Sequence, residues 1–324
     1  MNAAAQALAA LTDLLPGREA IAAEVLAGLS RHPRRLPSKY FYDERGSALF
    51  EQITRQPEYY LTRTELALLQ RVLPDIARQV GAHARVVEYG SGSGRKTRLL
   101  LHGLDRVVAY TPIEIARSAL LASVAHLAGE LPAVEMLPVC ADFTAPVRLP
   151  APQLPAARTL VFFPGSTLGN FTADEAVKLL LAMRQTMGPQ GLALIGIDLD
   201  KAPDVIEAAY NDAAGVTAAF TLNLLARLNR EIGSDFDLAQ FQHRARYHRQ
   251  RLRIETELVS RQAQTVHVAG QAFAFAAGEA MQVEYSHKYT EAGFAALAAA
   301  AGLQVVAGWD SEAPAFGLRL LQPA

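Results

Sequence analysis

Apolar runs alternate with helical stretches along the middle of the chain. A helical pattern extends from about residue 70 to 80, an apolar run follows at 85–89, and a second helical stretch leads to residue 104. Further runs typical of strands occur at 107–111, 134–140, 159–163 and 192–197, with helical segments between them. This alternation predicts a parallel sheet that carries helices on both faces.

The alternation stops between Lys201 and Lys288. Residues 204–232 have a helical pattern, and residues 252–268 and 272–285 alternate as strands do. A helix at 290–301 and strands at 304–308 and 315–321 would then complete the sheet. We therefore predict an α/β protein with a Rossmann-like domain of residues 61–200 plus 287–324. A second, inserted α+β domain would comprise residues 1–60 plus 201–286.

The first 29 residues are rich in Ala and Leu. Asp13 and Glu19 interrupt this segment and a basic start is missing, so we interpret it as an amphipathic helix and not as a signal peptide. The longest apolar stretch, residues 294–309, contains Gln304 and two glycines. It is shorter than the ~20 residues that a membrane-spanning helix needs, and we expect no membrane segment.

Charge and cysteine content narrow the function classes. Lys plus Arg number 31 and Asp plus Glu 32, a net charge of −1, which argues against a polyanionic partner and favours a small molecule. Cys140 is the one cysteine, so neither an intrachain disulfide nor a cysteine-rich zinc site can form. We expect a cytoplasmic protein that acts as a monomer.

A glycine-rich loop follows the apolar run at 85–89. Residues 90–94 read GSGSG and precede a helical stretch. Glycine lets the backbone turn sharply and approach a ligand closely, which makes Gly90 and Gly92 candidates for a nucleotide site. A dinucleotide fingerprint requires Gly or Ala where Arg95 stands, and a phosphate-binding P-loop requires a different glycine spacing. Both of these alternatives fit poorly.

The loop fits better to the E-x-G-x-G-x-G pattern of class I methyltransferases. In that pattern the acid before the glycines, here Glu88, helps to hold the methionine part of S-adenosylmethionine. Glu114 lies about one half of a βαβ unit further on, where a carboxylate accepts hydrogen bonds from ribose hydroxyls. After the next strand, Asp142 is placed for the adenine amino group and Phe143 for stacking. These elements, in order on successive strands, predict S-adenosylmethionine as the cofactor.

Other segments carry a closer resemblance. They read LPSKYFYD at 36–43, PEYY at 57–60, TRTE at 62–65, GSTLGNF at 165–171, AYNDAAGVTAAF at 209–220 and EYSHK at 284–288. With these segments, which span nearly the whole chain, the sequence resembles the histidine-specific Nα-methyltransferase family of ergothioneine biosynthesis. The resemblance implies transfer of up to three methyl groups to the α-amine of L-histidine, which yields the betaine hercynine.

The same resemblance implies that the Rossmann-like domain is a class I methyltransferase domain and that the inserted α+β domain is a substrate-binding domain. It also implies the residues of an amino-acid site between the two domains. Asn170 and Tyr210 would hold the carboxylate, Tyr42 and Tyr59 would lie near the amine and side chain, and Glu284 with Ser286 would bind the imidazole. Lys96 and Gly90 would join the cofactor site. The family match makes Tyr42 and Asn170 the candidate catalytic residues.

The chemistry of Glu284 and Ser286 agrees with the implied role. The two residues stand at i and i+2 in a strand-like stretch, so their side chains point to the same face. A carboxylate and a hydroxyl side by side can bond both nitrogens of an imidazole. Thr256 departs from the family, whose members carry Met beside the imidazole at this position. A hydroxyl in place of a thioether would loosen the fit or admit another ring.

Several alternatives stay open. The acceptor could be another amino acid, such as tryptophan or a modified histidine. An NAD-dependent oxidoreductase is disfavoured by Arg95, and a non-catalytic cofactor-binding module is the third possibility. The basic stretch at 242–253 is equally typical of the solvated face of a strand, so we expect no nucleic-acid partner. His243 and His248 have no carboxylate or cysteine partners at metal-ligand spacing, so we expect no metal.

Overall fold

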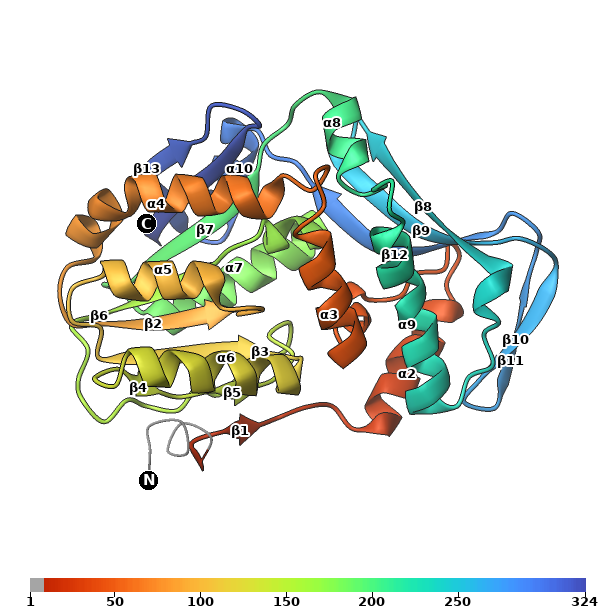
Figure 1. Cartoon of the computed structure of the whole chain (residues 1–324), viewed down its shortest axis with the longest axis horizontal. Coiled ribbons are helices and arrows are strands. Elements are labelled where there is room, and N and C mark those ends of the chain that lie inside the picture. Colours follow the sequence, from red (N-terminus) through yellow and green to blue (C-terminus); the bar gives the residue numbers. More distant parts are fainter. Residues whose placement is uncertain (1–8) are drawn as a thin grey trace. The chain divides into compact units, whose positions relative to one another are not determined.

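The computed structural model describes residues 9–324, and its contacts divide them into two compact units. The sheet unit comprises residues 9–15, Leu61–Asp200 and Lys288–Ala324, and the second unit comprises Pro16–Tyr60 and Lys201–His287 (Figure 1). These divisions coincide with the expected boundaries after residues 60 and 200. The chain returns to the sheet unit at Lys288, one residue later than expected. Residues 9–15, which we expected in the second domain, belong to the sheet unit.

One large sheet organises the sheet unit. Its strands are β1 (Thr12–Asp13), β2 (Ala84–Tyr89), β3 (Ala109–Glu114), β4 (Glu135–Met136), β5 (Val139–Cys140), β6 (Arg158–Phe163), β7 (Leu192–Asp198), β13 (Leu303–Asp310) and β14 (Phe316–Pro323). They lie in the order β1-β5-β3-β2-β6-β7-β14-β13, with β4 beside β3. The pairs from β1 to β7 are parallel, whereas β14 runs antiparallel to β7 and β13. The order reverses at β2, so the carboxyl ends of β2 and β6 flank the point where such sheets bind ligands.

Helices cover both faces of this sheet (Figure 1). On one face α7 (Ala173–Met187) and α10 (Glu291–Ala300) bury Leu180, Met183 and Phe294 against Val161 and Ile195 of the strands. On the other face lie α4 (Leu61–Val80), α5 (Arg95–Gly103) and α6 (Arg117–Glu130). The predicted Rossmann-like α/β fold is therefore confirmed.

The N-terminal prediction is wrong in part. Thr12–Asp13 form a strand that pairs in parallel with Val139–Cys140, and a helix, α2, extends from Arg18 to Leu29. Pro16 biases the preceding residue toward extended backbone, and Gly17 caps α2 in an extended conformation, so one helix cannot run through this point. Residues 1–8 of the expected helix lie outside the described residues.

Helices and antiparallel strands make up the second unit. Its helices are α2, η1 (Ser38–Phe41), α3 (Glu44–Ile53), α8 (Pro203–Ala208), α9 (Val216–Ile232) and η3 (Leu238–Gln240). Its strands are β8 (Phe241–His248), β9 (Arg253–Ser260), β10 (Gln264–Val268), β11 (Gln271–Phe275) and β12 (Ala280–His287). β9 lies between β8 and β12, and β10 pairs with β11. Helix α9 packs against α2, α3 and β8.

Turn residues divide segments that the sequence pattern predicts as continuous. The helical stretch 204–232 becomes α8 and α9, separated by a turn in which Gly215 has a φ of +72°. The strand-like stretch 272–285 becomes β11 and β12, separated at Gly278, whose φ is +80°. Positive φ values such as these favour glycine. The strand-like run 134–140 becomes β4 and β5, because Pro138 lies between them and has no N–H for a continuous ladder.

The chain leaves and re-enters the sheet unit at neighbouring points. Leu199 and Tyr289 form a parallel bridge, and the N–H of Tyr289 donates to the carbonyl of Asp198 at 2.9 Å. Beside this bridge the Lys288 ammonium lies 2.8 Å from the Asp198 carboxylate, and both side chains are completely buried. The two crossings are thus joined by main-chain hydrogen bonds and a buried ion pair.

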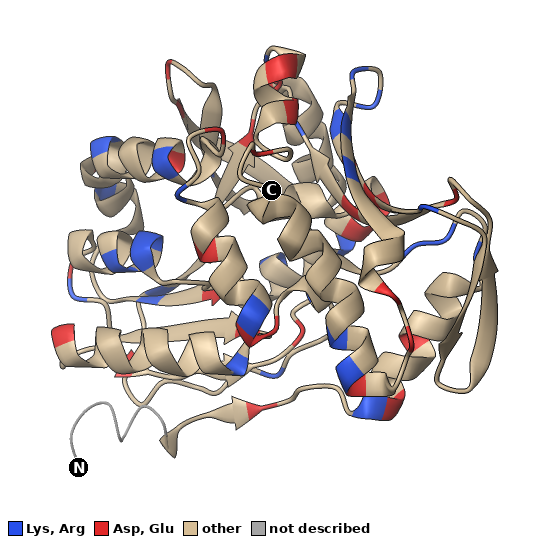
Figure 2. Ribbon diagram, turned by 45° about the vertical axis from the view of Figure 1, so that its right-hand side comes forward, with Lys and Arg blue, Asp and Glu red and all other residues tan. Residues whose placement is uncertain are grey.

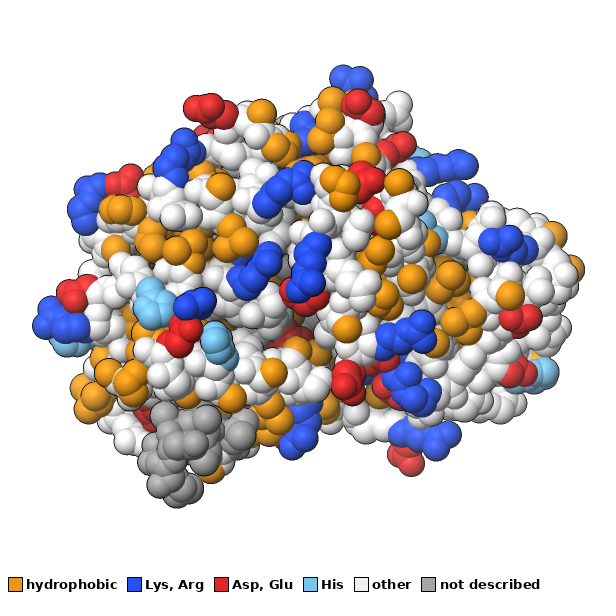
Figure 3. Space-filling model, in the orientation of Figure 1, with side chains coloured by type: hydrophobic (Ala, Val, Ile, Leu, Met, Phe, Trp, Pro, Cys, Tyr) orange, Lys and Arg blue, Asp and Glu red, His pale blue; other side chains and the backbone are white. Residues whose placement is uncertain are grey.

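Opposite charges are interspersed over the surface. Along β8 and β9, Arg244 pairs with Glu257 and Arg253 with Glu255, at N–O distances of 2.7 and 2.5 Å, so acidic partners accompany the basic stretch. Figure 2 shows basic and acidic positions in both units. On the face in Figure 3, basic, acidic and apolar side chains also alternate. In residues 9–324, no helix is long and apolar enough to cross a membrane. The described part of the chain holds no cluster of three or more His, Cys, Asp or Glu side chains arranged as metal ligands.

Candidate functional site

The glycine loop connects the carboxyl end of β2 with α5. Gly90, Gly92 and Gly94 all have positive φ values, of +73°, +49° and +71°. The N–H of Gly90 donates to the carbonyl of Ile113 at 2.8 Å, which ties the loop to β3. A Cβ built on Gly92 would meet nothing within 4 Å, so the loop borders open space. The buried hydroxyl of Ser91 has no hydrogen-bond partner among the described residues.

Beneath the loop, Glu88 belongs to a buried polar cluster. The Thr97 hydroxyl, in the first turn of α5, lies 2.8 and 2.6 Å from the two carboxyl oxygens, and the Tyr110 hydroxyl donates at 2.5 Å. Burial raises the pKa of Glu88 to about 8, although these hydroxyls lower it. The carboxyl group therefore joins β2, β3 and α5, and its contact with the methionine part of the cofactor stays a prediction.

Glu114 ends β3 and holds the loop from the side. Its carboxylate accepts hydrogen bonds from the N–H groups of Gly92 and Ala116, both at 3.0 Å. Burial raises the pKa of Glu114, and these N–H groups lower it in part. A carboxylate with two backbone donors keeps lone pairs for further donors, so it can also accept from ribose hydroxyls.

Asp142 and Phe143 follow β5. The Asp142 carboxylate accepts from the N–H and the hydroxyl of Thr144, at 2.9 and 2.6 Å. The Phe143 ring packs edge-on against Tyr89 and Phe163, with centroids 5.8 Å apart in both cases. A Cβ on Gly90 would lie 3.5 Å from Phe143, so the predicted stacking surface is next to the glycine loop.

Lys96 and Glu65 form an ion pair at the start of α5. Glu65 lies on α4 and its side chain is completely buried, and the Lys96 ammonium contacts one carboxylate oxygen. The N–H of Gly165, in the loop after β6, donates to the same carboxylate at 2.9 and 3.0 Å. A Cβ on Gly196 of β7 would come within 2.2 Å of Glu65. Glycine at 196 thus makes room for the carboxylate.

Asn170 ends the short helix η2 (Thr167–Asn170), which follows β6. Ser166 precedes η2 with a φ of +57°, and its hydroxyl accepts from the N–H of Asp198 at 2.8 Å. The Thr167 hydroxyl donates to the carbonyl of Pro164 at 2.8 Å. These bonds fix the loop that carries Asn170, beside the glycine loop at the order reversal of the sheet.

The residues at this edge of the sheet suit S-adenosylmethionine. The open space at Gly92 would be filled by any side chain, and the Ser91 hydroxyl has no partner inside the described protein. The Glu114 carboxylate suits a diol, and Phe143 offers an aromatic face. Glu88, Gly90, Gly92, Lys96, Glu114, Asp142 and Phe143 all belong to the sheet unit.

Most of the residues predicted for the amino acid belong to the second unit. Glu284 of β12 is the cross-strand partner of Thr256 of β9, and directly opposed residues share one face of a sheet. Ser286 lies two residues further on the same face, and its hydroxyl is 2.6 Å from that of Tyr210. The Thr256 hydroxyl is buried and has no hydrogen-bond partner among the described residues. This polar face of β9 and β12 thus gathers Tyr210, Thr256, Glu284 and Ser286.

Tyr42 and Tyr59 lie in an aromatic group of the second unit. The Tyr42 ring packs edge-on against Phe50 and Phe220, at centroid distances of 5.8 and 5.5 Å. Phe50 also packs edge-on against Tyr59, at 6.1 Å. The shared contact with Phe50 places both predicted tyrosines in one cluster.

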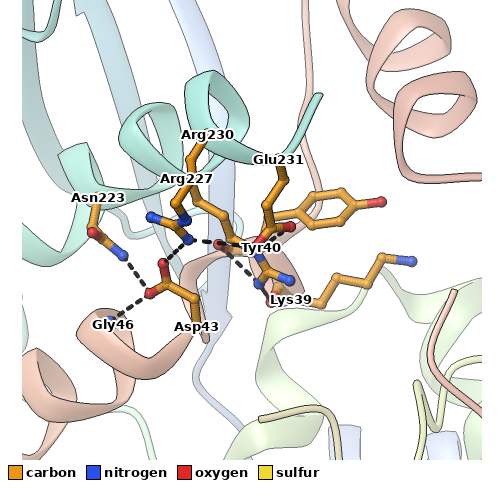
Figure 4. A network of polar contacts seen from close by, with 8 residues as sticks. All are labelled: Lys39, Tyr40, Asp43, Gly46, Asn223, Arg227, Arg230 and Glu231. Carbon is orange, nitrogen blue, oxygen red and sulfur yellow. Dashed lines mark hydrogen bonds and ion pairs between the residues drawn. The ribbon is translucent and has the colours of Figure 1, made fainter. Parts of the chain in front are cut away.

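Asp43, the residue after Tyr42, lies in a network of polar contacts. Figure 4 shows Asp43 with its partners Gly46, Asn223 and Arg230. Its carboxylate caps α3 by accepting from the N–H of Gly46 at 2.7 Å, and it accepts from Asn223 at 2.8 Å and Arg230 at 2.6 Å. Burial raises the pKa of Asp43, but these donors together hold it below its usual value. Helix α9 therefore anchors the start of α3 and, with it, Tyr42.

Comparison with known proteins shows the family of this chain. Residues 21–323 match the family described as histidine-specific, SAM-dependent methyltransferases. The chain belongs to this family. The prediction of an S-adenosylmethionine-dependent methyltransferase is thus confirmed, and the oxidoreductase and the non-catalytic module are set aside.

Curated relatives include histidine N-alpha-methyltransferases. The protein of this name from Mycolicibacterium smegmatis is 41% identical over 308 residues, which cover 93% of this chain and 94% of the relative. The one from Mycobacterium tuberculosis is 39% identical over 310 residues, covering 94% and 95%. More distant is the L-tryptophan methyltransferase of Psilocybe serbica, 25% identical over 331 residues, with coverage of 93% and 92%.

Sequence reasoning missed some residues that shape this candidate site. Thr97 and Tyr110 hold Glu88, and Glu65 holds Lys96 and the loop at Gly165. A carboxylate on the otherwise apolar side of a helix is a signal for Glu65, since such a group is buried only with partners. No local signal indicates the pairing of Glu88 with Tyr110, which depends on the register of β2 and β3.

Proposed function

We propose that this protein methylates the α-amine of free L-histidine up to three times and forms hercynine, the first step of ergothioneine biosynthesis. The polar face of β9 and β12 is the observation that carries the choice of acceptor. There Glu284, Ser286 and Thr256 present a carboxylate and two hydroxyls on one strand pair. An imidazole needs both an acceptor and a donor, and this set offers both.

The roles of the side chains follow from their chemistry. Glu284 accepts from the ring N–H, and Ser286, whose hydroxyl is fixed by Tyr210, lies beside it. Asn170 and Tyr210 hold the carboxylate of the amino acid, while Tyr42 and Tyr59 surround its amine. Neutral donors and acceptors orient the zwitterion without adding charge next to the amine.

S-adenosylmethionine supplies an activated methyl group. The protein must hold the α-amine with a free lone pair, because amines with a pKa of ~8 or above are mostly protonated at neutral pH. Tyr42 and Asn170 position that amine, and the surrounding aromatic rings exclude water. Alignment then accounts for most of the catalysis.

A second acceptor remains a candidate because of Thr256. Its buried hydroxyl has no partner among residues 9–324, and the family resemblance implies Met at this position. A distant relative bears the name L-tryptophan methyltransferase. Another amino acid, tryptophan above all, is therefore the alternative to histidine. We further propose that the enzyme is cytoplasmic and monomeric. The net charge of −1 favours action without a nucleic-acid partner.

One experiment tests the proposal. Calorimetry measures the binding of S-adenosylhomocysteine and of histidine or tryptophan, and mass spectrometry follows the products with S-adenosylmethionine. We expect mono-, di- and trimethylated histidine and a higher kcat/KM for histidine than for tryptophan. Preferred methylation of tryptophan would overturn the assignment of the acceptor and keep that of the cofactor.

A further inference from the structure

Lys96 and Glu65 form a largely buried ion pair beside the glycine loop. Lys96 stands two residues after the glycine loop, in the first turn of α5. Its ammonium is largely buried, and Glu65 is completely buried. A charge at this depth is costly unless a partner balances it. Glu65 provides the counter-charge from another helix.

S-adenosylmethionine and its product differ by one charge. The sulfonium makes the cofactor a cation, whereas S-adenosylhomocysteine carries a neutral thioether and is otherwise of nearly the same shape. An unbalanced lysine next to the loop would therefore repel the substrate form and spare the product. Because charges interact strongly where water is scarce, this difference would appear in the relative affinity of the two forms.

We propose that Glu65 is a positioning residue that cancels the charge of Lys96 and so prevents selective weakening of S-adenosylmethionine binding. The same carboxylate accepts the N–H of Gly165, at the base of the loop that leads to Asn170. Glu65 thus joins the first turn of α5 to the loop of a predicted amino-acid ligand within the sheet unit. The proposal rests on the site assignment in the proposed function.

The ratio of two dissociation constants tests this role. Calorimetry at low salt gives the Kd values of S-adenosylmethionine and S-adenosylhomocysteine, without any amino acid. Glu65→Gln keeps an oxygen for Gly165 and removes the negative charge. We expect Kd(S-adenosylmethionine)/Kd(S-adenosylhomocysteine) to rise by roughly five-fold or more in this variant. A folded variant with an unchanged ratio would overturn the proposal.

Two further variants separate charge from packing. In Glu65→Gln/Lys96→Gln the pair is neutral again, so the ratio should return to within about two-fold of the wild-type value. A ratio that stays high would contradict the charge argument. Glu65→Asp keeps the charge but is shorter, and it should weaken both ligands while leaving the ratio unchanged. Glu175→Gln is the control for the loss of one carboxylate elsewhere, and it should leave the ratio unchanged. Glutamine can also complete the capping box of α7, so this variant should fold.

If Glu65→Gln does not fold, Lys96→Gln provides the test with the opposite sign. It leaves an unbalanced carboxylate, so the ratio should fall below that of the wild type in the same buffer, and an unchanged ratio would again overturn the proposal. A wrong acceptor assignment would leave all these ratios untouched and would appear only in the product analysis. The two failures are therefore distinguishable.

Discussion

The cofactor side in the sheet unit and the polar face in the second unit hold their polar groups differently. Around the glycine loop, Glu88, Glu114 and Glu65 all receive hydrogen bonds from the protein itself. On the polar face, the Thr256 hydroxyl is buried without a partner among the described residues. The carboxylates of the first region are therefore held before any ligand binds, and there the buried Ser91 hydroxyl lacks a partner among the described residues. The second leaves a polar group for the ligand, and such a group discriminates between acceptors.

The largest effect should come from the glycine loop. Valine at Gly90 or Gly92 would force a β-branched residue to a positive φ and fill the space beside the loop. We expect the affinity for S-adenosylhomocysteine to fall by about 100-fold or more. Gly81→Val, with a similar φ of +72° and open space around it, is the control. Unchanged affinity in either loop variant would refute the site.

Glu114→Ala tests the acceptor for the ribose. The variant loses a charged hydrogen-bond acceptor and releases the N–H of Gly92, so cofactor binding should weaken by about 1.5–3 kcal/mol. Calorimetry with S-adenosylhomocysteine measures the loss, and Glu114→Gln should retain part of the affinity. An effect confined to the KM of the amino acid would assign Glu114 to the other region.

Glu284→Ala tests the polar face. Leaving the imidazole N–H unpaired in a dry site should cost about 1–3 kcal/mol in kcat/KM for histidine. The vacated volume should raise the ratio of kcat/KM for tryptophan over histidine. Affinity for S-adenosylhomocysteine should stay the same, because Glu284 belongs to the second unit. Unaltered kcat/KM for histidine would remove the imidazole assignment.

The free energy of unfolding should depend on pH through Glu88. Its pKa is about 8 in the folded chain, against an ordinary value of 4.5, so between these values the folded state holds a proton that the unfolded chain has released. The free energy of unfolding should therefore decrease as pH rises, by about 1.4 kcal/mol per pH unit. Urea titrations at pH 6 and 7 without cofactor measure this slope. Glu88→Gln mimics the protonated form and should flatten it by that amount, and an equal slope in both proteins would contradict the raised pKa.

The smallest effect concerns Thr256. Thr256→Val keeps the shape and removes the hydroxyl, so the KM for histidine should rise two- to ten-fold if the ligand is its partner, about 0.5–1.5 kcal/mol. The stability of the free protein should not fall, because no internal hydrogen bond is lost. A lower KM for histidine would mean that the hydroxyl stays unpaired in the complex as well.

Local patterns explain what could be predicted from the sequence. The apolar runs of β2, β6 and β7 identify a sheet that is buried on both faces, and the spacing of glycines identifies the loop with positive φ. The i, i+2 spacing of Glu284 and Ser286 indicates their common face. Each of these inferences depends on residues close together in the chain.

Non-local register explains what could not be predicted. The ladder between β12 and β9 shifts register between Gln282 and Glu284, and this shift places Thr256 opposite Glu284. Glu65 meets the N–H of Gly165, 100 residues away. β1 forms a strand only because β5 offers its edge. Propensity and periodicity contain no information on such partners.

The bridge between Leu199 and Tyr289 also bears on how the fold tolerates change. Because the ends of the segment 201–287 leave from adjacent residues of one ladder, closing that gap with a short turn costs little loop entropy. The sheet can therefore keep its own strand register when the length or sequence of this segment changes. Any such change must still fit residues 16–60, because α2 and α3 of that part pack against α9.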